Sequence, residues 1–259
     1  YIITNKKYKN LFNKNHWPIF VDNVLLSVSK ITEFLYPDSL NDAVDLSLCA
    51  PKKKDYKKVK FGQNVLIGKK VKIGNYTLIG HNSIIESNVS IGSKCIIGNN
   101  VIIKNSILGN NVRVLDGAVI GKKGFGFFPD KILNFRYPQI GLVIIEDNVE
   151  IGCGSTIDRG SLSNTVIGKN TFLDNQIHVA HNVKIGENCI IAGQVGFAGS
   201  STLGNNVMIG GQAGISGHLK IGNNVQIGGG SGVLKDIPDN TKVMGYPAKD
   251  LKSFIRENK

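Results

Sequence analysis

Apolar residues recur at every sixth position over most of this chain. Between Ile167 and Val233, twelve positions spaced six apart are all apolar, and the residue after each is often Gly. A period of six fits neither a helix, at 3.6 residues per turn, nor an antiparallel meander, but it is the period of a parallel β-helix. Each hexapeptide then forms one short flat side and one corner, with inward and outward residues alternating along the side. We therefore expect a mostly β protein built as a solenoid.

The same period predicts which residues stack. Three hexapeptides complete one triangular coil, so residues 18 apart lie one above the other, about 4.8 Å apart. The array begins near Phe61, and Leu108 arrives one residue early, which indicates a one-residue deletion at a corner. The period is lost at 121–142, where aromatic residues and Pro predict a long projecting loop. A ten-residue step from Ile157 to Ile167 predicts a second, shorter insertion.

The two ends of the chain lack the sixfold period. Asp22, followed by apolar residues at helical spacing as far as Pro37, predicts a helix with Asp22 as its cap. Residues 1–50 are then a small α-containing N-terminal piece. Residues 51–235 form the β-helix, and 236–259 form a C-terminal cap with a short helix, which would cover the open end of the core.

Charge and cysteine usage narrow the class of protein. Lys and Arg number 31 against 19 Asp and Glu, and the net charge of +12 favours an acidic partner. Lysines at corners also keep a solenoid soluble. No apolar run approaches the length of a membrane span, and no secretory leader pattern is found. Cys95 and Cys189 fall on inward positions and predict buried thiols, as suits a reducing cytoplasm.

One corner of the array carries candidate chemistry. His181 lies two residues past the inward Val179, so we expect its side chain to point outward. Gly199 lies one coil further on, where its N–H could stabilise an oxyanion in the same outer groove. His218 is two coils and one residue away, about 10 Å along the axis. This arrangement indicates acyl transfer, in which a neutral imidazole removes a proton from an amine or hydroxyl that attacks a thioester.

Eight short motifs carry a resemblance to a known family. Between about Gly121 and His218 the chain contains, in order, GFGFFPD, PQIG, VEIG, IDRG, TVIG, LDNQ, VAHNV and ISGH. These closely resemble the UDP-3-O-acylglucosamine N-acyltransferases of lipid A biosynthesis. The resemblance implies a left-handed β-helix and a cytoplasmic homotrimer with active sites between subunits. It also implies that a 3-hydroxyacyl group moves from acyl carrier protein to the 2-amine of the UDP-sugar. The donor is a phosphopantetheine thioester, so we expect no separate cofactor, no metal and no nucleic-acid partner.

The resemblance also implies residue roles. His181 corresponds to the general base, His218 to a residue that binds substrate or stabilises the oxyanion, and Gly199 to the oxyanion glycine. Three further polar residues match those that lie near the glucosamine: Asp174, Asn175 and Asn182.

The N-terminal piece resembles the end of the family's nucleotide-binding domain. There an aromatic-x-x-Asn-x-x-Tyr motif sandwiches uracil, and Asn5 and Tyr8 match its last two members. Ile2 stands where the aromatic residue belongs, and most of that domain has no counterpart here. A second departure is His178, which stands where the family tends to have an amide side chain.

Three other functions fit parts of the pattern. An acetyl-CoA-dependent nucleotide-sugar N-acetyltransferase shares the solenoid and the terminal GYPA, but such enzymes lack the GFGF loop and the IDRG stretch. A zinc-dependent hydratase on this fold binds its metal with three histidines from two subunits, which His178, His181 and His218 could supply. A non-catalytic scaffold leaves the clustered polar motif unexplained.

Overall fold

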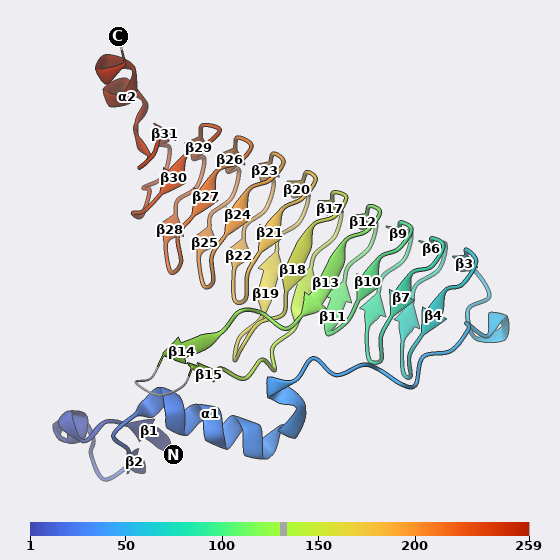
Figure 1. The fold of residues 1–259 in the computed structure, drawn as a ribbon, viewed down its shortest axis with the longest axis horizontal. Helices are drawn as coiled ribbons and strands as arrows, with labels where there is room; N and C mark the ends of the chain where they lie inside the picture. The colour runs from blue at the N-terminus through green and yellow to red at the C-terminus, as the bar shows by residue number, and fades with distance from the viewer. Residues whose placement is uncertain (130–133, 259) are drawn as a thin grey trace.

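The computed structural model describes residues 1–129 and 134–258 (Figure 1). Residues 130–133, within the predicted loop at 121–142, and residue 259, within the predicted C-terminal segment, lie outside the described residues. Within the described residues, three sheets of mainly parallel strands wrap around one core. The parallel β-helix predicted from the sixfold period is therefore confirmed.

The three sheets are the three faces of the solenoid. Sheet I has nine strands: β4 (Leu66–Ile67), β7 (Ile84–Ile85), β10 (Ile102–Ile103), β13 (Val119–Lys122), β18 (Thr156–Asp158), β21 (His178–Val179), β24 (Gly196–Phe197), β27 (Gly214–Ile215) and β30 (Gly232–Val233). Sheet II has eight: β5 (Lys72–Ile73), β8 (Ser90–Ile91), β11 (Ser106–Leu108), β16 (Val143–Ile145), β19 (Thr165–Ile167), β22 (Lys184–Ile185), β25 (Thr202–Leu203) and β28 (Lys220–Ile221). Sheet III has eleven: β3 (Lys60–Phe61), β6 (Leu78–Ile79), β9 (Ile96–Ile97), β12 (Arg113–Val114), β17 (Glu150–Ile151), β20 (Phe172–Leu173), β23 (Ile190–Ile191), β26 (Met208–Ile209), β29 (Gln226–Ile227), β31 (Lys242–Met244) and β32 (Lys249–Asp250).

The remaining elements lie outside the three faces. Near the N-terminus are β1 (Ile2–Thr4), β2 (Pro18–Phe20), the helix α1 (Val24–Leu35) and the 3-10 turns η1 (Lys6–Leu11), η2 (Pro37–Leu40) and η3 (Lys53–Asp55). An antiparallel hairpin of β14 (Phe127–Pro129) and β15 (Asn134–Arg136) projects from the solenoid toward α1, and α2 (Leu251–Glu257) extends from the opposite end to β3 (Figure 1).

Strand register confirms the interruptions inferred from the sequence. Where the period is unbroken, partners are 18 residues apart, as with Phe172 and Ile190. Leu108 pairs with Ile91, a step of 17, because one corner is a residue shorter. Strands β13 and β18 are adjacent in sheet I although the projecting hairpin separates them in the chain. The insertions leave the order of strands unchanged, but the register shifts between Ile120 and Lys122, where the chain leaves β13 for the hairpin.

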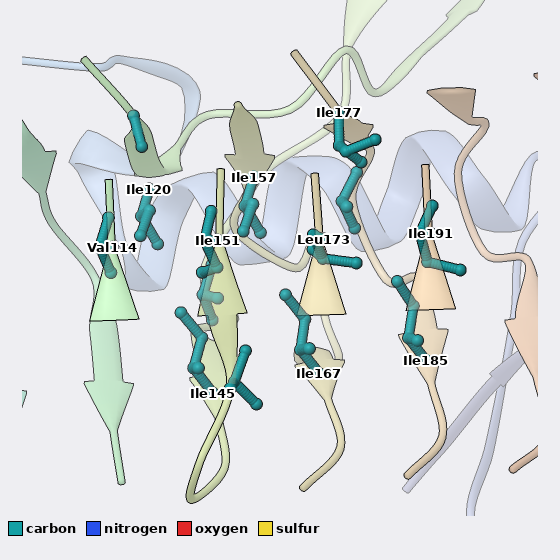
Figure 2. Close-up of a cluster of buried hydrophobic side chains, with 14 of the residues drawn as sticks. Val114, Ile120, Ile145, Ile151, Ile157, Ile167, Leu173, Ile177, Ile185 and Ile191 are labelled. Carbon is teal, nitrogen blue, oxygen red and sulfur yellow. The ribbon is translucent and has the colours of Figure 1, made fainter. Parts of the chain in front are cut away.

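The inward aliphatic residues form one continuous core. Figure 2 shows Val114, Ile151, Leu173 and Ile191 stacked along sheet III, with Ile167 and Ile185 of sheet II facing the same interior. The inward residue Ile209 is only 3% exposed. Because most strands of the solenoid are only two or three residues long, the burial of these aliphatic side chains is the main contribution to the stability of the fold.

Truncating one of these core residues tests the assigned register. We expect Ile209→Ala to lower the free energy of unfolding by about 2–5 kcal/mol, because removing buried aliphatic carbons loses transfer free energy and leaves a cavity. Chemical denaturation monitored by circular dichroism measures this. The exposed outward residue Lys220 of β28 provides the control, since Lys220→Ala should change the stability little. A loss below about 0.5 kcal/mol for Ile209→Ala would contradict the register.

The corners depend on residues that tolerate left-handed backbone. Of the non-glycine residues at positive φ, most are Asn, whose short polar side chain adopts this conformation at low cost. Their amides stack between coils: Asn170 Nδ2 donates to Asn188 Oδ1 at 2.8 Å, and Asn206 Nδ2 to Asn224 Oδ1 at 3.1 Å. The sequence pattern of Asn before an inward Val or Ile therefore marks the corners.

The N-terminal helix begins one residue later than predicted. Asn23 caps α1, and its side chain accepts a hydrogen bond from Leu26 N–H at 3.0 Å, so the assignment of Asp22 as cap was wrong. The backbone carbonyl of Asp22 is instead the acceptor for Asn5 Nδ2 at 3.1 Å. The helix ends before Pro37, as predicted.

An ion-pair cluster fixes the segment after α1 to the solenoid. The buried Lys104 ammonium lies 2.8 Å from an oxygen of Asp42 and 3.1 Å from one of Glu86, and Lys122 lies 2.9 Å from the other Asp42 oxygen. Burial opposes the charge on Lys104, but the two carboxylates raise its pKa. The N-terminal piece is thereby held against the face that carries the hairpin.

Candidate active site

The candidate catalytic corner lies between sheets I and II. His181 follows β21, and the next coil places Gly199 beside it: the N–H of Ser200 donates to His181 O at 2.9 Å. One coil further, the N–H of His218 donates to Gly199 O at 3.1 Å. The stacking predicted from the 18-residue spacing is therefore present, with His181 and His218 two ladder steps apart. The identity of these residues as catalytic groups stays a prediction.

Only Gly fits beside the His181 ring. A Cβ on Gly199 would lie 2.7 Å from both Cε1 and Nε2 of His181. The backbone of Gly199 therefore lies directly against the imidazole edge. Among the described residues, the N–H of Gly199 donates to no protein acceptor, whereas its carbonyl is paired. An unpaired backbone N–H on the glycine that lies against the ring is the kind of donor that an oxyanion beside a base requires.

Asn182 orients the His181 ring. Its Oδ1 accepts from Ser161 N–H at 2.8 Å, which turns its Nδ2 toward His181 Nδ1 at 3.2 Å. An amide nitrogen only donates, so this contact favours a neutral imidazole with its lone pair on Nδ1 and its proton on Nε2. For Nε2 to accept a proton, the ring proton must first lie on Nδ1, and Nδ1 must then donate to an acceptor in place of its contact with Asn182 Nδ2. Asn182 therefore contacts the ring directly.

The electrostatic environment keeps His181 neutral. Burial lowers its pKa below 6.5, and a positive charge on His218 lowers it further. A neutral imidazole near pH 7 is the form that removes a proton.

The loop preceding the hairpin covers the outer side of His181. A Cβ on Gly124 would lie 2.8 Å from His181 Cβ and 3.2 Å from Gln139 Oε1, so the loop backbone fits between these two side chains. Gln139 is 1% exposed, and its N–H donates to Ser39 O at 3.0 Å, which joins the loop to the N-terminal piece. Phe125 lies beside the histidines and is 67% exposed. The GFGF motif therefore shields one side of the ring.

A groove of about 650 Å³ runs from the histidines toward the C-terminus along the outer face of sheet I. Its floor has no side chains, because the outward residues of three consecutive strands are Gly196, Gly214 and Gly232. A Cβ added at Gly196 or Gly214 would meet nothing within 4 Å. From His178 to Gly232 there are three ladder steps, or about 14 Å. The groove is long, narrow and mostly apolar.

Different kinds of residue line the two sides and the far end of the groove. On one side is a ladder of amides, with Gln194 Nε2 donating to Gln176 Oε1 at 2.8 Å and Gln212 Nε2 to Gln194 Oε1 at 2.9 Å. On the other are small residues, including Ala198 and Ser216. Tyr246 closes the end: its ring lies so close to Gly232 that a Cβ there would overlap it.

Two predicted sugar-binding residues lie away from His181 within one chain. Asp174 and Asn175 occupy the corner between sheets III and I, on the far side of sheet I from His181. Both are exposed, and Asn175 Oδ1 accepts from Cys153 N–H at 2.7 Å. Asn182, by contrast, is next to His181. The structure therefore brings together His181, Gly199 and Asn182 but not the other pair.

His178 occupies the head of the groove. It is the outward residue of β21, in register with Gly196, and its Nδ1 lies 2.8 Å from Thr156 Oγ1. Residues 1–129 and 134–258 contain no cluster of three or more His, Cys, Asp or Glu side chains that could hold a metal ion.

The predicted uracil-binding residues lie on the first 3-10 turn. Asn5 caps η1, with its Oδ1 accepting from Lys7 N–H at 3.0 Å, so its amide is engaged by the backbone. Tyr8 is 46% exposed, and Lys7 Nζ lies 4.9 Å from its ring centroid. Trp17 is exposed next to Ile2, whose N–H donates to Trp17 O at 3.0 Å.

A partly buried carboxyl lies on β18, the strand that pairs with β21 in sheet I. Burial, with a smaller contribution from the charge of Asp42, raises the pKa of Asp158 to about 7. Asp158 ends β18, and its neighbour Arg159 donates through Nε to Gly141 O at 2.7 Å. The IDRG motif thus anchors the return of the projecting loop.

The raised pKa of Asp158 predicts a pH-dependent stability. The folded protein holds this proton up to about pH 7, whereas the unfolded chain releases it near 3.8, so this group lowers stability as pH rises between these values. We expect Asp158→Asn to raise the free energy of unfolding by roughly 2–4 kcal/mol near pH 8 and to have little effect near pH 4. Urea titrations across this range measure it. The substitution of the exposed Glu187 by Gln is the control. If the free energy of unfolding depends on pH in the same way for Asp158→Asn and the parent, the raised pKa of Asp158 is contradicted.

The described part of the chain has no helix long and apolar enough to cross a membrane.

Comparison with known proteins identifies the repeat and its relatives. The family described as Bacterial transferase hexapeptide (six repeats) matches residues 70–105, 164–199 and 200–235. A UDP-3-O-acylglucosamine N-acyltransferase of Caulobacter vibrioides is 51% identical over 150 residues, covering 58% of this chain and 44% of the relative. The enzyme of the same name from Agrobacterium fabrum is 53% identical over 150 residues, covering 58% and 42%. Over these residues the chain is a homologue of the two N-acyltransferases.

The homology has a limited extent. The match spans less than half the length of these curated relatives. Among solved structures, UDP-N-acetylglucosamine acyltransferase from Campylobacter jejuni superposes with a TM-score of 0.67 at 24% identity, covering 74% of this chain and 73% of that one. This likeness concerns the fold, and together with the hexapeptide repeats it confirms the left-handed β-helix that the sequence motifs implied.

Proposed function

We propose that this chain is an N-acyltransferase that moves a 3-hydroxyacyl group from acyl carrier protein to the 2-amine of a UDP-3-O-acylglucosamine. The observation that carries the proposal is the position of His181 and the free N–H of Gly199 at the head of an apolar, glycine-floored groove. Relatives that are about half identical over 150 residues and bear this enzyme name support it.

The groove accounts for the donor. An acyl chain laid on Gly196, Gly214 and Gly232 would place its thioester beside His181. Neutral His181 removes the proton as the sugar amine attacks the carbonyl, and the N–H of Gly199 stabilises the oxyanion that forms. The oxyanion then collapses, the carbon–sulfur bond of the thioester breaks, and the proton held by His181 passes to the departing phosphopantetheine thiolate. His218, two coils away, binds the substrate or assists at the oxyanion. The thioester belongs to the phosphopantetheine arm of the carrier protein, so the reaction needs no further cofactor.

A long groove also separates this function from the acetyl-CoA-dependent alternative. An acetyl group would leave most of the distance between His178 and Tyr246 empty. Burying each methylene of a longer chain contributes about 0.8 kcal/mol, so the groove favours long acyl donors.

We further propose that the chain works as a homotrimer in the cytoplasm, with each site between two subunits. Asp174 and Asn175 lie across sheet I from His181, so a neighbouring subunit would supply the pair that one chain cannot. The outward residues Phe172, Ile190 and Met208 form a stacked, exposed apolar stripe on sheet III, which supports burial against a partner. Sedimentation equilibrium measures the subunit number.

The direct test is a product assay. The protein is incubated with 3-hydroxyacyl carrier proteins of several chain lengths and a UDP-3-O-acylglucosamine, and the diacylated sugar nucleotide is measured by mass spectrometry. A parallel incubation with acetyl-CoA tests the alternative. N-acetylated product with acetyl-CoA and none from any long-chain donor would reject the proposal.

The N-terminal piece makes a separate prediction about the acceptor. If Tyr8 stacks on uracil, Tyr8→Ala removes one aromatic face, worth about 1 kcal/mol, and the acceptor KM should rise about fivefold. The donor KM should not change. Steady-state kinetics with each substrate varied in turn measure both, and Tyr36→Ala, an exposed tyrosine beyond α1, is the control. Unchanged acceptor KM in the Tyr8 variant would place nucleotide recognition elsewhere.

A further inference from the structure

Positive charge is concentrated at one end of the solenoid. Between residues 52 and 72 the sequence has nine lysines and a single acidic residue, Asp55, so this short stretch carries +8 of the chain's net +12. The C-terminal segment 236–259, next to the groove, has five basic and four acidic residues and is almost neutral. The surplus charge therefore does not surround the candidate active site.

The lysines surround the first coil. They lie in η3, before and in β3, at the corner between β4 and β5, and in β5, which is the end of the solenoid farthest from α2 (Figure 1). We call this set the basic end; its exposed members are Lys52, Lys54, Lys57, Lys58, Lys60, Lys69, Lys70 and Lys72. Along sheet I, β4 is five ladder steps from β21, about 24 Å from the candidate site.

The charge of the basic end is not compensated within the described chain. None of its eight exposed ammonium groups lies within ion-pair distance of a described carboxylate, whereas Lys104 and Lys122 are both paired. Lys58 Nζ lies 5.4 Å from the ring centroid of Tyr76, which is 61% exposed. Like charges held this close repel one another, and an external anionic surface would relieve that repulsion.

The positions of these lysines suit contact with a flat anionic surface better than with a linear polyanion. Lys60 lies on sheet III, Lys72 on sheet II, and Lys69 and Lys70 on a corner of the same coil, so a flat surface meets them together. A nucleic-acid duplex would contact the lysines on only one side of the basic end. The set contains no Arg, the residue that reads phosphate and base edges bidentately. Clusters of lysines with an exposed tyrosine are typical of proteins that lie on anionic headgroups.

We propose that the basic end docks the solenoid, end first, onto an anionic phospholipid bilayer. The rod then stands on the membrane with the groove about 24 Å above the headgroups, open to the aqueous phase. This docking does not depend on the acyl-transfer assignment, because it uses other residues at the other end of the molecule.

The test compares two variants of equal net charge. The basic-end variant replaces Lys57, Lys58, Lys60, Lys69 and Lys72 with Gln. The control variant replaces five exposed lysines elsewhere with Gln: Lys169, Lys184, Lys220, Lys235 and Lys242. Each protein is sedimented with vesicles of phosphatidylcholine alone and with vesicles that also contain phosphatidylglycerol, over a range of salt. Circular dichroism and thermal melting establish that both variants fold.

We expect the parent protein to bind only the anionic vesicles, with an affinity that falls as salt rises. The basic-end variant should lose about tenfold or more of this affinity, and the control variant should stay within about twofold of the parent. Equal losses in the two variants, or equal binding to neutral vesicles, would overturn the proposal. So would duplex DNA that binds the parent more tightly than the vesicles and releases it from them, since the basic end would then be a nucleic-acid surface.

Discussion

Replacing His181 with Ala is expected to lower kcat by about 10²–10⁴ while the solenoid stays folded. The three atoms nearest to a Cβ added at Gly199 all belong to the His181 imidazole, and burial and the nearby His218 lower the pKa of this ring. Its loss removes the proton acceptor but none of the groove floor, so the KM for the acyl donor should change little. The measurement is steady-state acyl transfer, with thermal melting to establish that the variant folds.

The matched comparison is His218→Ala. If His218 contributes hydrogen bonding alone, worth about 1.5–3 kcal/mol, its removal costs roughly tenfold to a hundredfold. Losing its charge also removes one of the two causes that lower the pKa of His181, so the acidic limb of kcat/KM should move to higher pH. A His218 variant without activity beside an active His181 variant would mean that base and auxiliary have been assigned the wrong way round.

The Asn182 contact gives a spectroscopic readout of the same base. With Asn182 Nδ2 at 3.2 Å from Nδ1, the free protein should carry the proton of neutral His181 on Nε2. Nitrogen-15 shifts of the ring distinguish the tautomers. A shift of the proton to Nδ1 when substrate binds is expected for a base that acts through Nε2.

Replacing Gly214 with Leu is expected to lower kcat/KM for long acyl donors on the order of 10²-fold and to leave transfer of short ones unchanged. Gly214 is the middle of the groove floor, and a Cβ there meets nothing within 4 Å, so the backbone tolerates the side chain. The leucine fills the space that the chain would occupy. Excluding several methylene groups at about 0.8 kcal/mol each lowers kcat/KM for long donors on the order of 10²-fold. Assays across donor lengths measure the change.

The control for this variant is Lys72→Leu. Lys72 is an exposed outward residue of β5 on sheet II, far from the groove, so the same side chain there should leave donor preference unchanged. Equal activity of Gly214→Leu with long and short donors would mean that the acyl chain lies elsewhere.

The sequence predicted the solenoid well because its physical signal is periodic. Each inward aliphatic must face the core, so the sixfold pattern also revealed the deletion near Leu108 and the insertion after Ile157. The cap of α1 was misplaced because Asp22 and Asn23 are both good capping residues. Only the structure gives the backbone geometry that chooses Asn23.

The candidate site was predicted where it follows the ladder. His181 and Gly199 are 18 residues apart, so their contact could be read from spacing. The same signal would have found the groove floor, since Gly196, Gly214 and Gly232 are also 18 apart on outward positions. Phe125, Gln139 and Tyr246 could not be found in this way, because they reach the site from segments outside the repeat.

The stacked asparagine corners make the solenoid modular in its length. Each coil contacts only the coils before and after it, and its corner amides bond to equivalent amides on either side. Inserting one extra 18-residue coil after His218 would therefore preserve every neighbour relation while moving Tyr246 one ladder spacing, about 4.8 Å, further from the catalytic corner. The length of the substrate that fits would then change in whole-coil increments, a route by which evolution can vary specificity without altering the reacting groups.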